Sequence, residues 1–256
     1  MRSLEELHLL SAKLEGKHNG EDGAKSEIRL TYKSFCSTET EVLCISLRRT
    51  IRVPDNGMTY GLPPDLGPFP IYSVNKYMNN LPEIMVAKGG VFVPIHQREA
   101  MWINFTSYHP FAVKVCVGGV NAVSGEYTVE SLAKSLRRKA KLDKGESIQD
   151  YVVTGLNGQQ WLDGVAKLDG KVMQFVATSA GNGYSVEAQI TGADEVCGIQ
   201  IEIIPSVINE GTSRKFCVKT LTGKDIVLSI DAAMTVYELK MKICQIEGIP
   251  VDQQRE

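Results

Sequence analysis

The sequence predicts a mainly β protein in which an antiparallel, sandwich-like body precedes a small unit made of one hairpin and one helix. Three observations carry this prediction. Short apolar segments bounded by Pro, Gly, Asn or Ser recur between residues 28 and 205, as strands do in all-β domains. One stretch of the body, residues 129–142, has a clear helical spacing of apolar residues. After residue 213 the pattern changes to two alternating segments followed by an amphipathic helix.

The composition is that of a globular protein, with 43% hydrophobic and 23% charged residues. A formal net charge of -2 gives no reason to expect binding to nucleic acid. No apolar run reaches the roughly 18 residues of a membrane span, and the N-terminus lacks the apolar core of a signal peptide. We therefore expect a cytoplasmic or nuclear protein without nucleic-acid or membrane partners.

The cysteines lack the close CxxC pairing of zinc and redox motifs, so we expect reduced structural thiols. They are Cys36, Cys44, Cys116, Cys197, Cys217 and Cys244.

Residues 1–27 are predicted to form an N-terminal helix and a flexible link. Leu4, Leu7, Leu10 and Leu14 recur at spacings of three and four, which places them on one face of a helix over residues 1–15. Residues 14–27 are polar and contain glycine, which favours a link.

The β-rich body is predicted to span residues 28–205. In the helix predicted at 129–142, Leu132, Leu136 and Ala140 share a face, with Lys and Arg around them. Strand patterns occur at residues 28–32, 42–47, 50–53, 91–95, 101–105, 112–117, 151–153, 172–178, 184–190 and 198–204.

The stretch 58–74 is rich in Pro and Gly and is excluded from helix and central strand, because proline fixes φ and has no N–H to donate. We expect an ordered loop with apolar anchors at Leu62, Leu66, Phe69 and Ile71.

A linker-like stretch, residues 206–213, precedes the C-terminal segment, residues 214–256. Apolar residues alternate in two predicted strands on either side of Gly223, which is free to take positive φ in a turn. Thr235 and Glu238 have the spacing of a capping box at the start of a helix, and Gly248 and Pro250 end that helix. One stripe of this helix is expected against the hairpin: Val236, Leu239, Ile243 and Ile246.

Three ordered blocks of this segment resemble the ubiquitin family: VKTLTGK at 218–224, EGIP at 247–250 and DQQR at 252–255. The spacing between the blocks fits that family without a gap. The resemblance implies the first half of a β-grasp, a hairpin crossed by a helix, in which the stripe named above is buried. It also implies candidate acceptor lysines at Lys219, Lys224, Lys240 and Lys242, and a candidate interaction residue at Leu221.

The segment departs from the family at Glu256, where the family has an apolar residue. The sequence stops before the remaining strands, the isoleucine-centred receptor patch and the di-glycine end that the resemblance implies. A unit of about 40 residues is at the lower limit for independent stability. We expect a truncated ubiquitin-like domain; the alternative is a half-domain that docks on the body.

Several runs within residues 45–205 resemble a family of uncharacterised, mostly fungal and bacterial proteins, some with a ubiquitin-like segment behind this domain. This resemblance implies a recurring domain with no assigned activity. The runs are RTIRVPD at 49–55, QREAMW at 97–102, GGVNA at 118–122, QWLDG at 160–164 and QFV at 174–176.

Residues with metal-binding or nucleophilic chemistry occur singly in the body. His96, Glu99 and His109 are of metal-ligand type, but Pro94 argues against a helix that would align them. Cys116 with His109 would make a nucleophile and a base, yet Cys116 lies in an apolar strand pattern and is expected in the core.

The remaining candidates each have an ordinary structural interpretation. Asp55, Glu126 and Asp163 could act as acid and base, but they lie in turn-like contexts where carboxylates are common. Gly118–Gly119 lacks the lysine and hydroxyl of a phosphate loop and is expected to be a turn. Trp102 and Trp161 are expected as buried anchors, and the basic cluster at 134–144 as a solvated helix face.

We therefore expect a non-enzymatic protein without cofactors that acts by protein–protein contact, with ubiquitin receptors or proteasome components as partners. The alternative is that the body is an enzyme or ligand-binding domain and the ubiquitin-like part a cleavable or vestigial tail. A pocket that gathers His96, Glu99, Asp163 or Cys116 would favour the alternative.

Overall fold

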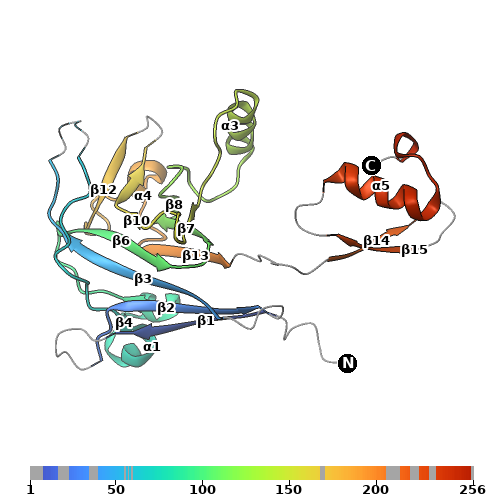
Figure 1. The fold of residues 1–256 in the computed structure, drawn as a ribbon. Helices are drawn as coiled ribbons and strands as arrows, with labels where there is room; N and C mark the ends of the chain where they lie inside the picture. Colours follow the sequence, from blue (N-terminus) through green and yellow to red (C-terminus); the bar gives the residue numbers. More distant parts are fainter. Residues whose placement is uncertain are drawn as a thin grey trace. The chain divides into compact units, whose positions relative to one another are not determined.

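The computed structural model describes residues 8–16, 23–34, 40–54, 56, 58, 60–167, 171–205, 214–219, 225–230 and 235–254. The chain divides into a body, Met1–Ser206, and a C-terminal unit, Val207–Glu256 (Figure 1).

The strands of the body are β1 (His8–Glu15), β2 (Glu27–Ser34), β3 (Thr40–Thr50), β4 (Tyr72–Ser73), β5 (Val91–Phe92), β6 (Ala100–Ser107), β7 (Phe111–Val117), β8 (Val120–Asn121), β9 (Val152–Val153), β10 (Trp161–Leu162), β11 (Gly164–Ala166), β12 (Val172–Val176) and β13 (Ile199–Pro205). Its helices are α1 (Val74–Tyr77), η2 (Met78–Asn80), α2 (Glu83–Lys88), α3 (Leu132–Asp143) and α4 (Val186–Thr191). The C-terminal unit contains β14 (Arg214–Lys219), β15 (Asp225–Ile230), α5 (Val236–Glu247) and η3 (Val251–Gln253).

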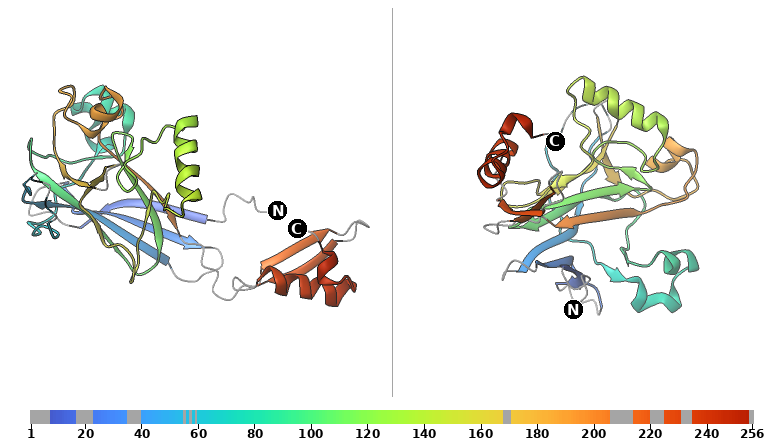
Figure 2. Two further views of the ribbon diagram at one scale, coloured as in Figure 1. Left: turned by 90° about the horizontal axis from the view of Figure 1, so that it is seen from above. Right: turned by 90° about the vertical axis from the view of Figure 1, so that its right-hand side faces the viewer.

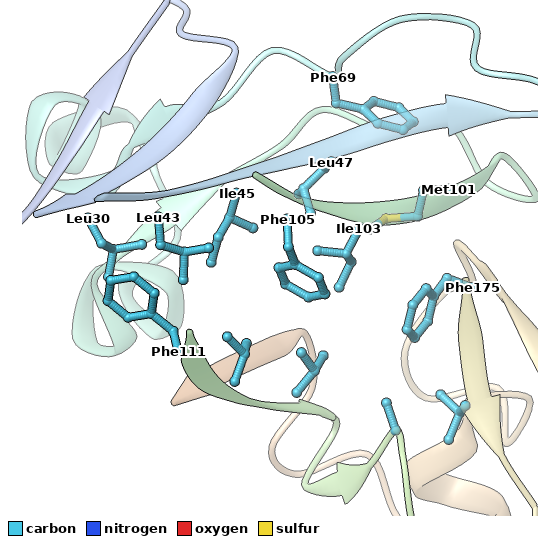
Figure 3. Packing of buried hydrophobic residues seen from close by; sticks show 14 of the residues in the cluster. Leu30, Leu43, Ile45, Leu47, Phe69, Met101, Ile103, Phe105, Phe111 and Phe175 are labelled. Carbon is cyan, nitrogen blue, oxygen red and sulfur yellow. The ribbon is translucent and has the colours of Figure 1, made fainter. Parts of the chain in front are cut away.

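Two antiparallel sheets of the body enclose one hydrophobic core (Figure 3). The larger sheet has the order β1-β2-β3-β6-β12-β11, with β10 also paired to β6; the smaller has the order β13-β7-β8, with β9 paired to β7. Leu43, Ile45 and Leu47 alternate along β3 on the side of the core, and Phe111 and Val113 of β7 belong to the same cluster. The predicted antiparallel, sandwich-like body is therefore confirmed.

Two long pairings hold the sandwich. β3 pairs with β6 from Leu43↔Ser107 to Thr50↔Ala100, and β13 pairs with β7 along its whole length. Since β6 and β7 follow each other directly in the chain but lie in different sheets, the turn at residues 108–110 joins the two layers.

The predicted N-terminal helix is wrong for residues 8–15, which form β1 at the edge of the larger sheet. Leu10, Ala12 and Leu14 also alternate with period two, and this is the pattern that the fold uses. Each pairs with an apolar or aromatic residue of β2, in the register Leu10↔Tyr32, Ala12↔Leu30 and Leu14↔Ile28. Cross-strand pairing thus overrides the local helical spacing.

The strand predicted at 184–190 is also wrong, because Val186–Thr191 form α4. Ser185 is its N-cap, accepting a hydrogen bond from Ala188 N at 2.8 Å, and Gly192 with φ of 87° is its C-cap. These end signals decide the conformation, and they place Glu187 rather than an apolar residue in the buried position.

Other boundaries differ by shorter stretches. β3 ends at Thr50, so residues 51–53 of the predicted strand 50–53 are not strand, and β5 keeps only two residues of the predicted strand 91–95. The short helices between residues 74 and 88 were not predicted. In the proline-rich loop, Phe69 and Ile71 are buried anchors as expected, whereas Leu62 and Leu66 are exposed.

The C-terminal unit is a hairpin, β14–β15, with α5 lying across one face (Figures 1 and 2). The predicted capping box is present: Thr235 accepts from Glu238 N, and Glu238 accepts from Thr235 N at 2.7 Å. Gly248 ends the helix with φ of 70°. Leu239 and Ile243 of the predicted stripe are half-buried, whereas Val236 and Ile246 at its two ends are 58% and 53% exposed.

Four cysteines in the described residues are free thiols, as predicted: Cys44, Cys116, Cys197 and Cys244. None of the helices described here is long and apolar enough to cross a membrane.

Candidate functional site

A groove of about 840 Å³ lies at one end of the body's sandwich. Its floor is apolar and continues the core through Met101, Val165 and Phe175. Its walls are strand β12, helix α4, residues 52–54, 58, 60, 61 and 63, and residues 194 and 197–199. Clefts of this size with an apolar floor and a few polar groups are the usual form of a ligand site.

The groove has a rim of both charges. Arg52, Lys167 and Lys171 lie on the side of β12, and Glu187 and Asp194 lie on the side of α4. The arrangement can therefore accept a molecule with an apolar body and a polar or anionic end, because the floor removes apolar surface from water and the rim offers donors.

The wall formed by residues 194–197 is held by one buried carboxylate. Glu187 accepts hydrogen bonds from the N–H groups of Glu195, Val196 and Cys197, at 3.1, 2.6 and 2.8 Å. Burial by itself raises the pKa of Glu187, but the three donors outweigh burial and leave this pKa below its ordinary value. The loop is thus built around an ionised glutamate.

Glu187, Asp194 and Cys197 are the one group in the described part of the chain whose ligand atoms lie close enough, within 4.8 Å of one another, to hold a metal ion. Both carboxylates already have donors, since Asp194 accepts from Gly181 N at 2.6 Å and from the Ser185 hydroxyl. The two carboxylates therefore stabilise the surrounding loop through hydrogen bonds, which accounts for their position without a metal ion.

The opposite wall is fixed by Gln174 of β12. Its side-chain amide accepts from Val53 N at 3.0 Å and donates to Ile51 O at 2.9 Å. The Gln174 side chain thus takes the place of a backbone partner, and its two hydrogen bonds hold residues 51–53 beside β12 although these residues are not strand.

A second polar cluster fixes α3 to the body. Arg138 Nε donates to the buried Glu126 carboxylate at 2.7 Å, and Arg138 Nη2 donates to Asp150 at 3.1 Å. Lys114 Nζ lies 3.4 Å from the same Asp150 carboxylate. Burial raises the pKa of Asp150, but the lowering effect of Arg138 and Lys114 is larger, so this pKa lies below its ordinary value.

His96 and Glu99 do come together, though not as metal ligands. The Glu99 carboxylate accepts from the backbone N–H of His96 at 2.9 Å and from Arg49 Nε at 2.7 Å. Burial raises the pKa of Glu99, but the two donors lower it by more, so this pKa lies below its ordinary value. His109 follows β6 whereas His96 precedes it, so the full length of that strand separates the two histidines.

Cys116 and His109 are likewise not a pair. His109 precedes β7 and Cys116 is near the other end of that strand, roughly 20 Å away at about 3.3 Å per residue. Burial raises the pKa of the Cys116 thiol, which disfavours the thiolate that a nucleophile needs. The expectation that Cys116 is a core residue is confirmed.

The other sequence candidates are dispersed. Asp55 lies outside the described residues, Glu126 is paired with Arg138, and Asp163 lines the groove. Gly118 and Gly119 both have positive φ in the turn between β7 and β8, as expected. Trp102 is buried as predicted, whereas Trp161 is 39% exposed.

The candidate lysines of the C-terminal unit differ in their surroundings. Lys240 Nζ donates to Gln254 O at 3.0 Å, and Lys242 is half-buried on α5. Lys219 is the last residue of β14, while Leu221 and Lys224 lie outside the described residues.

Comparison with known families matches residues 216–255 to the Ubiquitin family. The match covers β14 from Phe216 onward, β15, α5 and η3. The protein therefore carries a C-terminal ubiquitin-like segment behind a β-rich body. No solved structure matches the chain. The likeness of the body to a recurring fungal and bacterial domain stays a prediction.

Proposed function

We propose that the protein is a non-enzymatic interaction protein of the cytoplasm or nucleus whose ubiquitin-like unit makes protein–protein contacts. The observation that carries this proposal is the match of residues 216–255 to the Ubiquitin family, together with a hairpin and a capped helix over the same residues. Ubiquitin receptors or proteasome components are the partner class.

The unit offers an apolar surface for such contacts. Val236, Tyr237 and Ile246 of α5 are each more than half exposed. Exposed apolar and aromatic side chains gathered on one short element are typical of interaction surfaces.

Surface plasmon resonance with the immobilised full chain tests the proposal. The analytes are purified proteasome and a panel of single ubiquitin-receptor domains. We expect binding in the micromolar range to at least one analyte, reduced about tenfold by Ile246→Asp. Gln245→Asp changes the neighbouring exposed residue of the same helix and is the matched control. Absence of binding, or an equal loss in both variants, would refute the proposal.

A second candidate function, ligand binding by the body, is favoured by the groove. Of the four residues that a catalytic pocket was expected to gather, the groove contains Asp163 but not His96, Glu99 or Cys116. Its apolar floor and the basic side of its rim suit binding of an amphipathic anion.

The fluorophore 8-anilinonaphthalene-1-sulfonate is a direct probe, since it has an apolar ring system and a sulfonate. Binding that falls with Tyr60→Ala in the groove, and stays unchanged with Tyr108→Ala outside it, supports this function. Equal binding by both variants contradicts it.

A further inference from the structure

Helix α3 is attached to the body by its charged side and turns its leucines to solvent. Lys134 is 5% exposed, whereas Leu132 and Leu136 are 77% and 58% exposed. A helix on the surface of a globular protein normally buries its apolar stripe and exposes its charges. Figures 1 and 2 show α3 at the periphery of the body, outside the two sheets.

The inward side of α3 is satisfied by specific partners. Arg138 pairs with Glu126 and Asp150, and Lys134 Nζ donates to Glu130 at 2.7 Å. Ser131 caps the helix by accepting from Lys134 N at 3.2 Å. These bonds fix the orientation of the helix, so its outward side is preorganised before any partner arrives.

The outward side is an apolar stripe with a basic flank on each edge. Leu132, Leu136 and Ala140 follow one another at a spacing of four, with the exposed Ala133 beside them. At 100° per residue, Lys139 lies on one edge of the stripe and Arg137 and Lys144 lie on the other. These three side chains are exposed, and among the residues that the structure describes they form no ion pair.

Charge and shape together define the occupant. The segment 131–145 holds six basic residues against the single acidic Asp143, in a chain of net charge -2. Unpaired cations on both edges complement carboxylates placed on both edges of a partner's apolar stripe. The alanines beside the leucines leave a shallow surface on which a second helix can pack closely.

An anionic membrane fits this surface less well. Asp143 lies in line with the leucines, one turn beyond Ala140, and would be pressed against negative headgroups. The stripe has only two large apolar side chains, whereas stable binding in a membrane interface needs a wide apolar face.

We propose that the outward face of α3 is a docking site for an acidic amphipathic helix of a partner protein. This site belongs to the body and is separate from the contacts assigned above to the ubiquitin-like unit.

Fluorescence anisotropy with the full chain tests this proposal. The probe is a labelled synthetic helical peptide with leucines at i, i+4 and i+7 and glutamates on both sides of them. We expect micromolar binding that weakens as salt is raised. A peptide with lysines in place of the glutamates is expected not to bind.

Leu136→Asp is expected to weaken binding about tenfold or more. Leu142→Asp is the matched control, because Leu142 is on the same helix, is 55% exposed and lies outside the stripe. The helical circular dichroism of both variants shows whether α3 is intact. Equal effects of the two variants, binding without salt dependence, or preference for vesicles of equal parts phosphatidylserine and phosphatidylcholine would each overturn the proposal.

Discussion

Replacing Arg138 by alanine removes the side chain that joins α3 to two carboxylates of the body. Its guanidinium is 2.7 Å from Glu126, whose side chain is 6% exposed, and 3.1 Å from Asp150. Breaking a buried ion pair costs roughly 3–5 kcal/mol, because the remaining charge stays buried without its partner. Arg138 is 23% exposed and Asp150 keeps Lys114 at 3.4 Å, so we expect a cost at or below the lower limit of this range, about 2–3 kcal/mol.

Urea unfolding followed by tryptophan fluorescence measures this change in the body alone, since both tryptophans, Trp102 and Trp161, lie there. With a slope of about 2–3 kcal/mol/M, the midpoint is expected to fall by about 1 M. Arg137→Ala, on the exposed side of the same helix, is the control and should change the free energy of unfolding by less than about 0.5 kcal/mol.

A double-mutant cycle with Glu126→Gln isolates the pair. The two changes should be non-additive by about 1–2 kcal/mol, because each removes the same contact. Additive effects, or an Arg138→Ala variant as stable as the Arg137→Ala control, would refute the assignment of this cluster as the anchor of α3.

Three further predictions concern the groove wall and the C-terminal helix. Because the pKa of Glu187 is lowered, its ionised form stabilises the fold above the ordinary glutamate pKa, and this contribution is lost as pH falls through the lowered pKa. In urea titrations, the free energy of unfolding should therefore fall more steeply with acid for the wild type than for Glu187→Gln. Equal slopes would contradict this. Gly118→Ala should lower the free energy of unfolding by about 2 kcal/mol or more in the same assay, against about 1 kcal/mol for Gly192→Ala. Both glycines have positive φ, but a Cβ at position 118 would lie 2.6 Å from Glu187 Cβ, whereas one at position 192 meets nothing within 4 Å. Equal losses would argue against this packing. Thr235→Ala should destabilise α5 by about 1 kcal/mol, measured as faster hydrogen exchange of its amides, and unchanged exchange would mean that the cap is not needed.

Local patterns predicted most of the sandwich and the C-terminal unit. Alternation in β3, β6 and β7 identifies core strands because one face of each is buried. In α5, the capping box and Gly248 mark both ends, since these signals act within a few residues. The apolar residues of segment 8–15 fit both a helical and a strand period. Pairing with β2 makes this segment a strand, and that pairing cannot be seen in the local sequence.

The groove and the α3 anchor could not be predicted because each depends on residues distant in sequence. Glu187 looks like an exposed residue of an alternating strand until the loop 195–197 folds around it. The leucines of α3 were correctly placed on one face, but the sequence does not show that this face turns outward. That orientation follows from Glu126 and Asp150, which bind Arg138 on the other side.

An NMR titration of the full, isotope-labelled chain with a purified ubiquitin-receptor domain shows directly which residues make the contact. We expect backbone shift changes to concentrate in the C-terminal unit, on β14, β15 and α5, and to saturate at micromolar to sub-millimolar receptor. Changes confined to the groove of the body, or no changes with any receptor of the panel, would contradict the claim that the ubiquitin-like unit makes the contacts.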